Sequence, residues 1–362
     1  MLAAGWLPQV FLLLAGGVWA DRLPRNVVMV GSNLLSAATQ AVVALLLLTG
    51  HAQLWHLVAL SAARGVASSF FFPASQGLVP QTVSAGRLQQ ANALLRLSLN
   101  GTNIGGAAVG GVLVAAVGSG WAIAFDGATY AASAAILAQM SIQAAERAAG
   151  RNFLHELREG WGEFRSRTWL WAIVAQAGVG NMAWAGGFIV LGPLVSRREL
   201  GGAAAWGAIL ACQSAGLVLG GLAALRLRPQ RQLFVGTAGL LLLGPVVVCF
   251  ALGAPVAVIA GAALCSGVGL ELFSVFWDTS LQQHVPLDVL SRVSSYDALG
   301  SFVAIPVGLS IVGPISDAIG VKETLWIIAA VQVSSVLAVL GVRDVRELRR
   351  VDAPPALTES PA

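Results

Sequence analysis

Four ionisable side chains in this sequence stand inside long apolar segments, where a charge has little water to solvate it. They are Arg64, Arg96, Asp126 and Glu271. A charged side chain at the centre of a lipid bilayer costs roughly 2.5–3.5 kcal/mol on insertion scales, so such residues usually face a cavity and serve a function. The four are therefore our candidates for a pathway taken by a substrate or by protons.

Each of these residues also has a structural interpretation. Arg64 lies ten residues past Leu54, near the middle of its segment. In a functional role it could attract an anionic substrate group or tune the pKa of a proton-carrying carboxylate. In a structural role it could form a buried pair with a carboxylate or with helix carbonyls. Arg96 could extend to the membrane surface. Asp126 could cap a helix instead of carrying a proton. Glu271 could exchange a proton, as a proton-coupled carrier requires, or it could have a structural or cavity-lining role.

A further charged cluster, formed by Asp21, Arg22 and Arg25, lies in a tight turn that contains Pro24. A carboxylate in such a turn can cap the positive N-terminus of a neighbouring helix and pair with arginine. The two arginines alone could reflect the excess of basic residues in cytoplasmic joints. An aspartate beside two arginines goes beyond that rule and indicates a specific polar contact.

The composition sets the class of protein that must position these residues. Apolar residues make up 57% of the 362 residues and charged residues 10%, with a mean hydropathy of +0.78, against about 25% charged in a soluble domain. Too little polar surface remains to coat a water-soluble globule, so the sequence predicts an all-α protein embedded in the bilayer. The net charge of +4 gives no indication of a nucleic-acid partner.

Other chemistry is not indicated. The sequence has no phosphate-binding P-loop and no nucleophile elbow. Its four histidines and three cysteines are scattered without metal-ligand spacing. We therefore predict no cofactor, no metal site and no enzymatic activity.

Eleven apolar segments each approach the roughly 20 residues needed to cross a bilayer. They are 4–20, 26–49, 54–75, 91–117, 121–140, 169–195, 203–225, 232–252, 255–277, 295–315 and 322–342. The sequence thus predicts an N-terminal half-bundle over 1–140, a cytoplasmic linker over 141–168, a C-terminal half-bundle over 169–342 and a cytoplasmic tail over 343–362. The linker has an amphipathic pattern around Phe153, Leu157, Trp161 and Phe164, and the tail after Arg350 is predicted to be disordered.

The distribution of basic residues predicts the orientation. Sixteen arginines fall in joints on one side of the predicted spans, against Arg197, Arg198 and Lys322 on the other. The arginine-rich side is cytoplasmic by the positive-inside rule. The C-terminus is then inside and residue 1 outside, in a multi-pass protein of the bacterial inner membrane.

The chain carries an internal repeat. Gly16-Gly17 followed by Arg22-Leu23 recurs as Gly220-Gly221 followed by Arg226-Leu227, an offset of 204 residues. Arg87 and Asn92-Ala93-Leu94 recur as Arg292 and Asp297-Ala298-Leu299, and Pro80 recurs as Pro286. Parallel six-helix repeats that hold a substrate between them are one construction of secondary carriers. Subtracting the offset from 169–195 places its counterpart before Met1, so the first half is expected to lack its first helix.

The stretch Gly17 to Asn26 resembles the signature between the second and third helices of the major facilitator superfamily. Gly17, Asp21, Arg22 and Arg25 match it, whereas Pro24 replaces a glycine and Asn26 a basic residue. The resemblance implies two homologous six-helix bundles, with Asp21, Arg22, Arg25 and Gly17 in a cytoplasmic latch that breaks during alternating access. Its partner would be the helix starting near Arg292. Leu225 stands where the second half would carry its own aspartate, so the latch is expected to be one-sided.

Two further stretches resemble the macrolide-efflux and enterobactin-exporter branch of that superfamily. One is Arg64 to Ala74 with Pro80 and Ala91-Asn92-Ala93-Leu94, and the other is Gly105 to Gly111. The second resembles an antiporter motif with Gly106 in place of proline. Its glycines are predicted helix-packing residues: Gly105, Gly106, Gly110 and Gly111.

The leading functional prediction is a monomeric carrier that couples protons to the efflux of an amphipathic drug or a siderophore-like metabolite. The first alternative keeps the fold and reverses the direction, giving a solute uptake permease. The second alternative is a degenerate carrier that no longer transports and acts as a membrane scaffold or sensor. Charges kept inside spans would be odd in such a protein, because nothing would offset their insertion cost.

Overall fold

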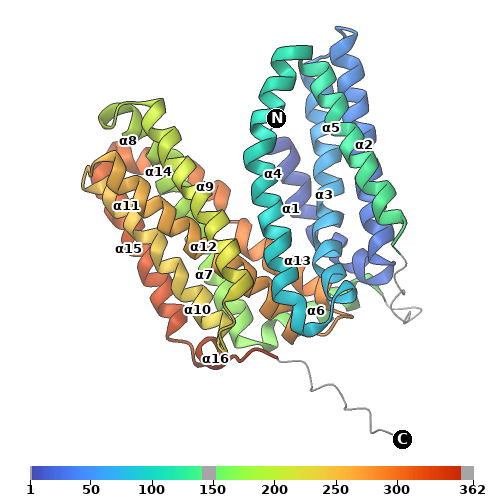
Figure 1. Ribbon diagram of the computed structural model, residues 1–362. Helices are drawn as coiled ribbons and strands as arrows, with labels where there is room; N and C mark the ends of the chain where they lie inside the picture. Colours follow the sequence, from blue (N-terminus) through green and yellow to red (C-terminus); the bar gives the residue numbers. More distant parts are fainter. Residues whose placement is uncertain (1, 141–151, 352–362) are drawn as a thin grey trace, which may run out of the picture. The chain divides into compact units, whose positions relative to one another are not determined.

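A computed structural model describes residues 2–140 and 152–351, and of residues 2–11 the backbone alone (Figure 1). Every regular element in these ranges is helical, so the all-α prediction is confirmed. Ten helical segments among the described residues are long and apolar enough to cross a membrane. A further helix, α1 (Leu2–Arg22), covers the predicted span 4–20.

The ten segments follow the remaining predicted spans in order. They are α2 (Arg25–Leu48), α3 (Leu54–Thr82), η1 (Ala85–Arg87) with α4 (Leu88–Val117), α5 (Ser119–Ala138), α7 (Thr168–Trp184) with η2 (Ala185–Leu191) and α8 (Gly192–Glu199), α9 (Ala203–Arg226), α10 (Gln232–Gly239) with η3 (Leu240–Leu243) and α11 (Gly244–Ala251), α12 (Val256–His284), α13 (Leu290–Phe302) with α14 (Ile305–Ile319), and α15 (Val321–Leu340).

The largest departures from the predicted bounds are at polar helix ends. Helix α3 continues to Thr82 and α12 to His284, each seven residues beyond the predicted end, and α13 begins at Leu290 instead of 295. Hydropathy marks only the apolar part of a helix, whereas the backbone hydrogen bonds continue into polar sequence. These extensions carry several of the polar contacts described below.

The described chain forms two compact units. The first comprises the described parts of residues 1–78, 99–181 and 287–307, and the second those of 79–98, 182–286 and 308–362. In the first unit α1 packs on α13 and α2 on α5; in the second α12 packs on α9 and α10 (Figure 1). Each unit draws helices from both halves of the sequence. The half-bundle, linker and tail boundaries predicted from the repeat stay a prediction.

The repeated glycine pairs mark close approaches of helices. A Cβ built on Gly16 would lie 2.0 Å from the carbonyl oxygen of Ser69 on α3, and one on Gly220 would lie 2.8 Å from that of Val268 on α12. The second glycine of each pair approaches the other half of the sequence, Gly17 on α13 and Gly221 on α4. The sequence repeat is therefore a repeat of helix packing, and its second contact joins the two sequence halves within each unit.

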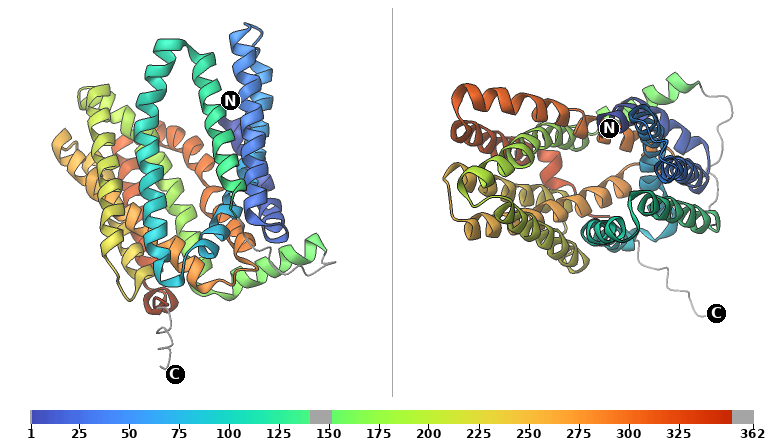
Figure 2. Two further views of the ribbon diagram at one scale, coloured as in Figure 1. Left: turned by 45° about the vertical axis from the view of Figure 1, so that its right-hand side comes forward. Right: turned by 90° about the horizontal axis from the view of Figure 1, so that it is seen from above.

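The predicted amphipathic segment of the linker is helix α6 (Phe153–Ser166), whose N-terminus is capped by the side chain of Asn152 at 3.4 Å from the Leu154 amide. It runs crosswise to the spans of the first unit (Figure 2). The rest of the linker, 141–151, and the tail beyond Val351 lie outside the described residues. The start of the tail forms the short helix α16 (Arg343–Glu347).

Candidate functional site

The turn after α1 brings the predicted cluster together. Pro24 lacks an N–H group and disfavours helical geometry at the residue before it, so α1 ends at Arg22 and α2 starts at Arg25. Arg25 follows Asp21 by four residues across this turn. Its Nη2 donates to Asp21 Oδ1 at 3.2 Å, and each side chain is only 5% exposed.

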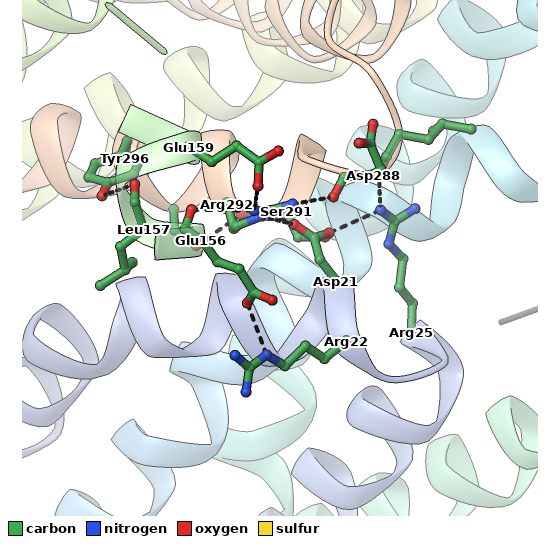
Figure 3. A network of polar contacts seen from close by, with 12 residues as sticks. Asp21, Arg22, Arg25, Glu156, Leu157, Glu159, Asp288, Ser291, Arg292 and Tyr296 are labelled. Atoms are coloured by element: carbon green, nitrogen blue, oxygen red, sulfur yellow. Dashed lines mark hydrogen bonds and ion pairs between the residues drawn. The ribbon is translucent and has the colours of Figure 1, made fainter. Parts of the chain in front are cut away.

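Asp21 also caps the start of α13. Its Oδ2 accepts hydrogen bonds from the backbone N–H of Arg292 at 3.2 Å and from Arg292 Nε at 3.1 Å (Figure 3). A carboxylate at a helix N-terminus satisfies an otherwise unpaired N–H and interacts favourably with the helix dipole. The predicted contact between Asp21 and the helix near Arg292 is therefore present.

Arg25 links two further segments at the same place. Its Nη1 donates to the carbonyl of Gly77 on α3 at 2.6 Å, and its Nη2 donates to the carbonyl of Leu287, just before α13. Asn26 occupies the position of the signature's second basic residue and donates instead to the carbonyl of Met140 at 2.9 Å. The departure from the signature thus replaces a charge with an amide that holds the end of the α5 segment.

Gly17 permits the approach of α1 to α13. It lies one turn before Asp21, and a Cβ at this position would come within 2.3 Å of Ser295 Oγ and 2.9 Å of the Ser291 carbonyl oxygen. Any larger residue would force the two helices apart and withdraw Asp21 from Arg292. The match of Gly17 to the signature has this steric reason.

Helix α6 completes the cluster. The sequence analysis did not predict the contacts that this helix makes. Arg22 Nε donates to Glu156 Oε2 at 2.9 Å, Arg292 Nη1 to Glu159 Oε2 at 2.8 Å, and the Tyr296 hydroxyl to the Leu157 carbonyl at 3.0 Å (Figure 3). The available signal was a pair of glutamates three residues apart in the amphipathic segment. We call Asp21, Arg22, Arg25, Arg292, Glu156 and Glu159 the latch cluster.

Burial also affects the protonation of Asp21, which lies beyond the predicted span 4–20. Desolvation raises the pKa of this carboxyl above its usual value, although the charges of Arg25 and Arg292 lower it. Protonation would remove the one carboxylate that pairs with both Arg25 and Arg292.

The repeat-related joint between α9 and α10 is held by amides. Gln89 on α4 donates to the carbonyls of Ala224 and Leu227, and its own Oε1 accepts from Gln232 at 2.8 Å. Leu225 leaves this joint without the carboxylate of its counterpart. The contacts that hold this joint are therefore between uncharged groups, although its sequence also carries Arg226, Arg228 and Arg231. The one-sided latch stays a prediction.

Two of the four charged candidates lie in the second unit. Arg96 Nη2 and Nε bond to Asp278 Oδ2 at 2.8 and 3.1 Å, beside hydrogen bonds from Asn92 to Thr279 and Gln282. The partner lies on the polar extension of α12. Glu271 is 3% exposed and lies where Gly220 of α9 meets α12.

The other two lie in the first unit. The exposed side chain of Arg64 places its guanidinium carbon 5.8 Å from the centre of the Tyr130 ring on α5. Among the described residues, no carboxylate lies within ion-pair distance of it. Asp126 accepts a hydrogen bond from Gln40 on α2. The four residues thus divide between the units, and their roles in a pathway stay predictions.

The four glycines proposed to pack helices are Gly105, Gly106, Gly110 and Gly111 on α4. A Cβ at each of them would meet no atom of the described residues within 4 Å. The structure therefore shows no packing partner for them in that part of the chain, and their role stays a prediction. No cluster of metal-ligating side chains was found among the described residues either.

Apolar spans, paired glycine contacts and a capped, charged helix joint define a polytopic helical carrier of the major facilitator type. The family model MFS_3, described as transmembrane secretion effector, matches residues 1–359. The chain therefore belongs to this family of the major facilitator superfamily, and the predicted resemblance is confirmed. The family and its relatives are transporters, in agreement with the prediction that the chain is not an enzyme.

Two curated relatives share about a quarter of their residues with the chain. The multidrug efflux pump Tap of Mycobacterium tuberculosis is 25% identical over 96% of this chain and 85% of its own length. Macrolide efflux protein A of Streptococcus pyogenes is 24% identical over 96% of this chain and 87% of its own length.

Solved structures share the fold at lower identity. A bacterial homologue of the iron transporter ferroportin, in an outward-facing state, has a TM-score of 0.68 and 18% identity over 93% of this chain and 87% of its own. The human organic anion transporter MFSD10 has a TM-score of 0.69 and 15% identity over 93% of this chain and 82% of its own. At these identities the likeness establishes the fold alone.

Proposed function

We propose that the protein is a secondary carrier that exports an amphipathic drug or a siderophore-like metabolite through the bacterial inner membrane, driven by protons. It acts as a monomer by alternating access, with the latch cluster and the C-terminus on the cytoplasmic side. The two curated relatives, a multidrug pump and a macrolide efflux protein, support the direction and the class of substrate.

The observation that carries the proposal is the buried pair between Asp21 and Arg292. Both side chains are about 5–6% exposed, and the carboxylate also caps a helix. Removing one partner of a buried ion pair costs about 3–5 kcal/mol, because the other charge is left without compensation. Opening the joint to water would solvate both groups together, so neither charge would be left buried and unpaired in the open state that alternating access requires.

Proton coupling requires an acidic group in a span that can gain and lose a proton. Glu271 is the buried candidate, and Asp126 with its Gln40 contact is the second. Arg64 is the candidate for an anionic group of the substrate, because a guanidinium in a span attracts negative charge. These assignments follow from residue type and placement.

Inverted membrane vesicles test the direction and the driving force. With the inside acidified, an exporter accumulates the substrate inside the vesicles, and dissipating the proton gradient stops the accumulation. Candidate substrates come from a drug-susceptibility panel that compares expressing and deleted strains. Accumulation only in right-side-out vesicles would instead indicate the uptake permease, and absence of transport in both would indicate the scaffold.

A further inference from the structure

Helix α6 presents a buried face and an exposed face. Glu156, Gly160 and Phe164 are buried and form the face that meets α1 and α13. Leu154, Arg158, Trp161 and Arg165 follow one another at intervals of four, three and four residues, so they share a second face. All four are exposed, with Leu154 at 64% and Trp161 at 48%. We call these four residues the outer face of α6.

The charges of α6 are segregated between its faces. Its acidic residues Glu156, Glu159 and Glu163 pair with Arg22, Arg292 and Arg167 respectively. Among the described residues, neither Arg158 nor Arg165 makes an ion pair. The outer face therefore has an uncompensated positive charge of two, next to an exposed leucine and an exposed tryptophan.

The position of α6 limits what this face can meet. The helix lies in the chain between the spans of α5 and α7, runs crosswise to the spans of the first unit (Figure 2), and is tied to the end of α1 through Arg22 and Glu156. It therefore lies at the level where spans leave the hydrocarbon. At that level a bilayer offers phosphate groups and the upper part of the acyl chains.

Apolar and basic side chains on one face of a crosswise helix fit that boundary. Leucine and tryptophan enter the headgroup region, and arginines bind the lipid phosphates. Each basic residue near an anionic leaflet contributes about 1 kcal/mol, or about a fivefold change in affinity. The Trp161 ring contacts Phe164 and Tyr296, with ring centroids 5.5 and 5.4 Å away, and still remains 48% exposed. The exposed part of this ring and Leu154 gain nothing in water, whereas the interface accommodates both the apolar surface and the charges.

We propose that the outer face of α6 binds anionic phospholipid headgroups of the cytoplasmic leaflet and that this binding holds the latch cluster closed. The coupling is direct, since Glu159 and Glu156 of the same helix accept hydrogen bonds from Arg292 and Arg22 respectively. The proposal rests on the proposed cytoplasmic placement of the latch cluster. It makes the inner-leaflet composition a determinant of how readily the carrier opens.

A fluorescent label on the outer face tests the binding without a transport assay. The three cysteines (Cys212, Cys249, Cys265) are replaced by alanine, and Leu154→Cys is labelled with an environment-sensitive dye. In nanodiscs, adding phosphatidylglycerol to phosphatidylcholine should shift the emission to the blue and bring the dye within reach of headgroup-labelled quenching lipids. The matched control is His155→Cys, on the neighbouring exposed position, which should respond far less. Equal exposure of the Leu154→Cys label to water in both lipids would overturn the proposal.

The arginines are tested in the same labelled protein. The pair Arg158→Gln and Arg165→Gln should raise the phosphatidylglycerol fraction needed for half of the shift by about 25-fold, or abolish the shift, because the fivefold changes of the two residues multiply. The control pair Arg228→Gln and Arg231→Gln removes two exposed arginines from another joint and should leave it unchanged. An equal loss of the emission shift in both double variants would show an effect of net charge. It would contradict specific lipid binding by the outer face of α6.

Transport measured in the same lipids separates this inference from the proposed function. Phosphatidylglycerol should change the transport rate severalfold in the wild type and in the control pair, and not in the Arg158 and Arg165 pair. A label shift without transport of any tested substrate would refute the proposed function and retain lipid binding. Proton-driven export that is equal in all lipids, with no label shift, would refute the inference and retain the function.

Discussion

A single carboxylate compensates two guanidiniums in the latch cluster. Asp21 uses one oxygen for Arg25 and the other for the amide and side chain of Arg292. The two carboxylate oxygens of Asp21 therefore accept hydrogen bonds from residues at the starts of two helices, α2 and α13. An amide of the same shape keeps one acceptor oxygen and loses the charge, so it cannot hold both arginines.

Asp21→Asn is therefore expected to reduce transport tenfold or more while insertion and membrane levels stay normal. The measurement is proton-driven accumulation in inverted vesicles, normalised to the amount of protein in the membrane. Asp344→Asn, an exposed carboxylate in α16, is the matched control and should transport like the wild type. Wild-type rates in Asp21→Asn would remove the latch role of this residue.

Glu271 is expected to control coupling and not substrate binding. In Glu271→Gln, transport should no longer respond to an imposed pH gradient, because the amide cannot carry a proton, while substrate binding persists. The experiment compares initial rates across a series of external pH values with equilibrium binding in detergent. Asp317→Asn removes an exposed carboxylate from α14 and serves as the control. An unaltered pH profile in Glu271→Gln would exclude the residue from coupling.

At the scale of single residues, contacts could be predicted where the partners lie close together in the sequence. Asp21 and its arginines are close in sequence, and the signature indicated Arg292 as the partner. Glu156, Glu159 and Tyr296 were missed because their contacts depend on how α6 packs across α13, which composition does not show. The ion pair of Arg96 with Asp278 was missed as well, since the polar extension of α12 was not expected to remain helical.

Helix packing in this chain depends on glycine at defined places. Gly16, Gly17, Gly220 and Gly221 each stand where a Cβ would come within 3 Å of a neighbouring helix. Apolar helices gain little from hydrophobic association inside lipid, so close contact through small residues stabilises their packing. The repeated pairs were visible in the sequence, but the helix that each glycine meets was not.

Gly17→Ala should lower the melting temperature of the purified protein by several degrees and reduce transport, because the added methyl would meet the Ser291 carbonyl and Ser295 Oγ. Gly31→Ala on α2 is the control, since a Cβ there meets nothing within 4 Å of the described residues. Replacing an open helical glycine by alanine is neutral or stabilising by up to about 1 kcal/mol. Thermal unfolding in detergent distinguishes the two variants, and equal melting temperatures would show that α1 tolerates a wider approach to α13.

At the scale of the whole molecule, the order and extent of the spans were predictable and the membership of the compact units was not. Hydropathy reports each helix by itself, so it located the spans from 26–49 to 322–342 close to their observed bounds. Which helices share a unit depends on contacts such as Gly17 with α13 and Gly221 with α4, which join residues far apart in the chain. A carrier built this way has two repeat-related joints, one held by ion pairs at Asp21 and one held by amide hydrogen bonds at Gln89.

Alternating access predicts that these two joints open together, although they belong to different units. Gln89→Ala removes the donor to the carbonyls of Ala224 and Leu227 and leaves Gln232 without its acceptor. Unsatisfied buried polar groups cost about 1–3 kcal/mol, which favours the open state of the joint at Gln89. If one global transition opens both joints, the joint at Asp21 must open more often as well.

The probe for this coupling is a cysteine at Ser295 of α13, a buried position that faces Gly17 of α1. In a background without the native cysteines, Gln89→Ala should raise the labelling rate of Ser295→Cys by a membrane-permeant maleimide about fivefold or more, since 1 kcal/mol changes a population by about that factor. Gln53→Ala, at an exposed loop position, should leave the rate unchanged. A rate in Gln89→Ala equal to that of the control would mean that the joints open independently, and a two-state rocking motion could not then describe this carrier.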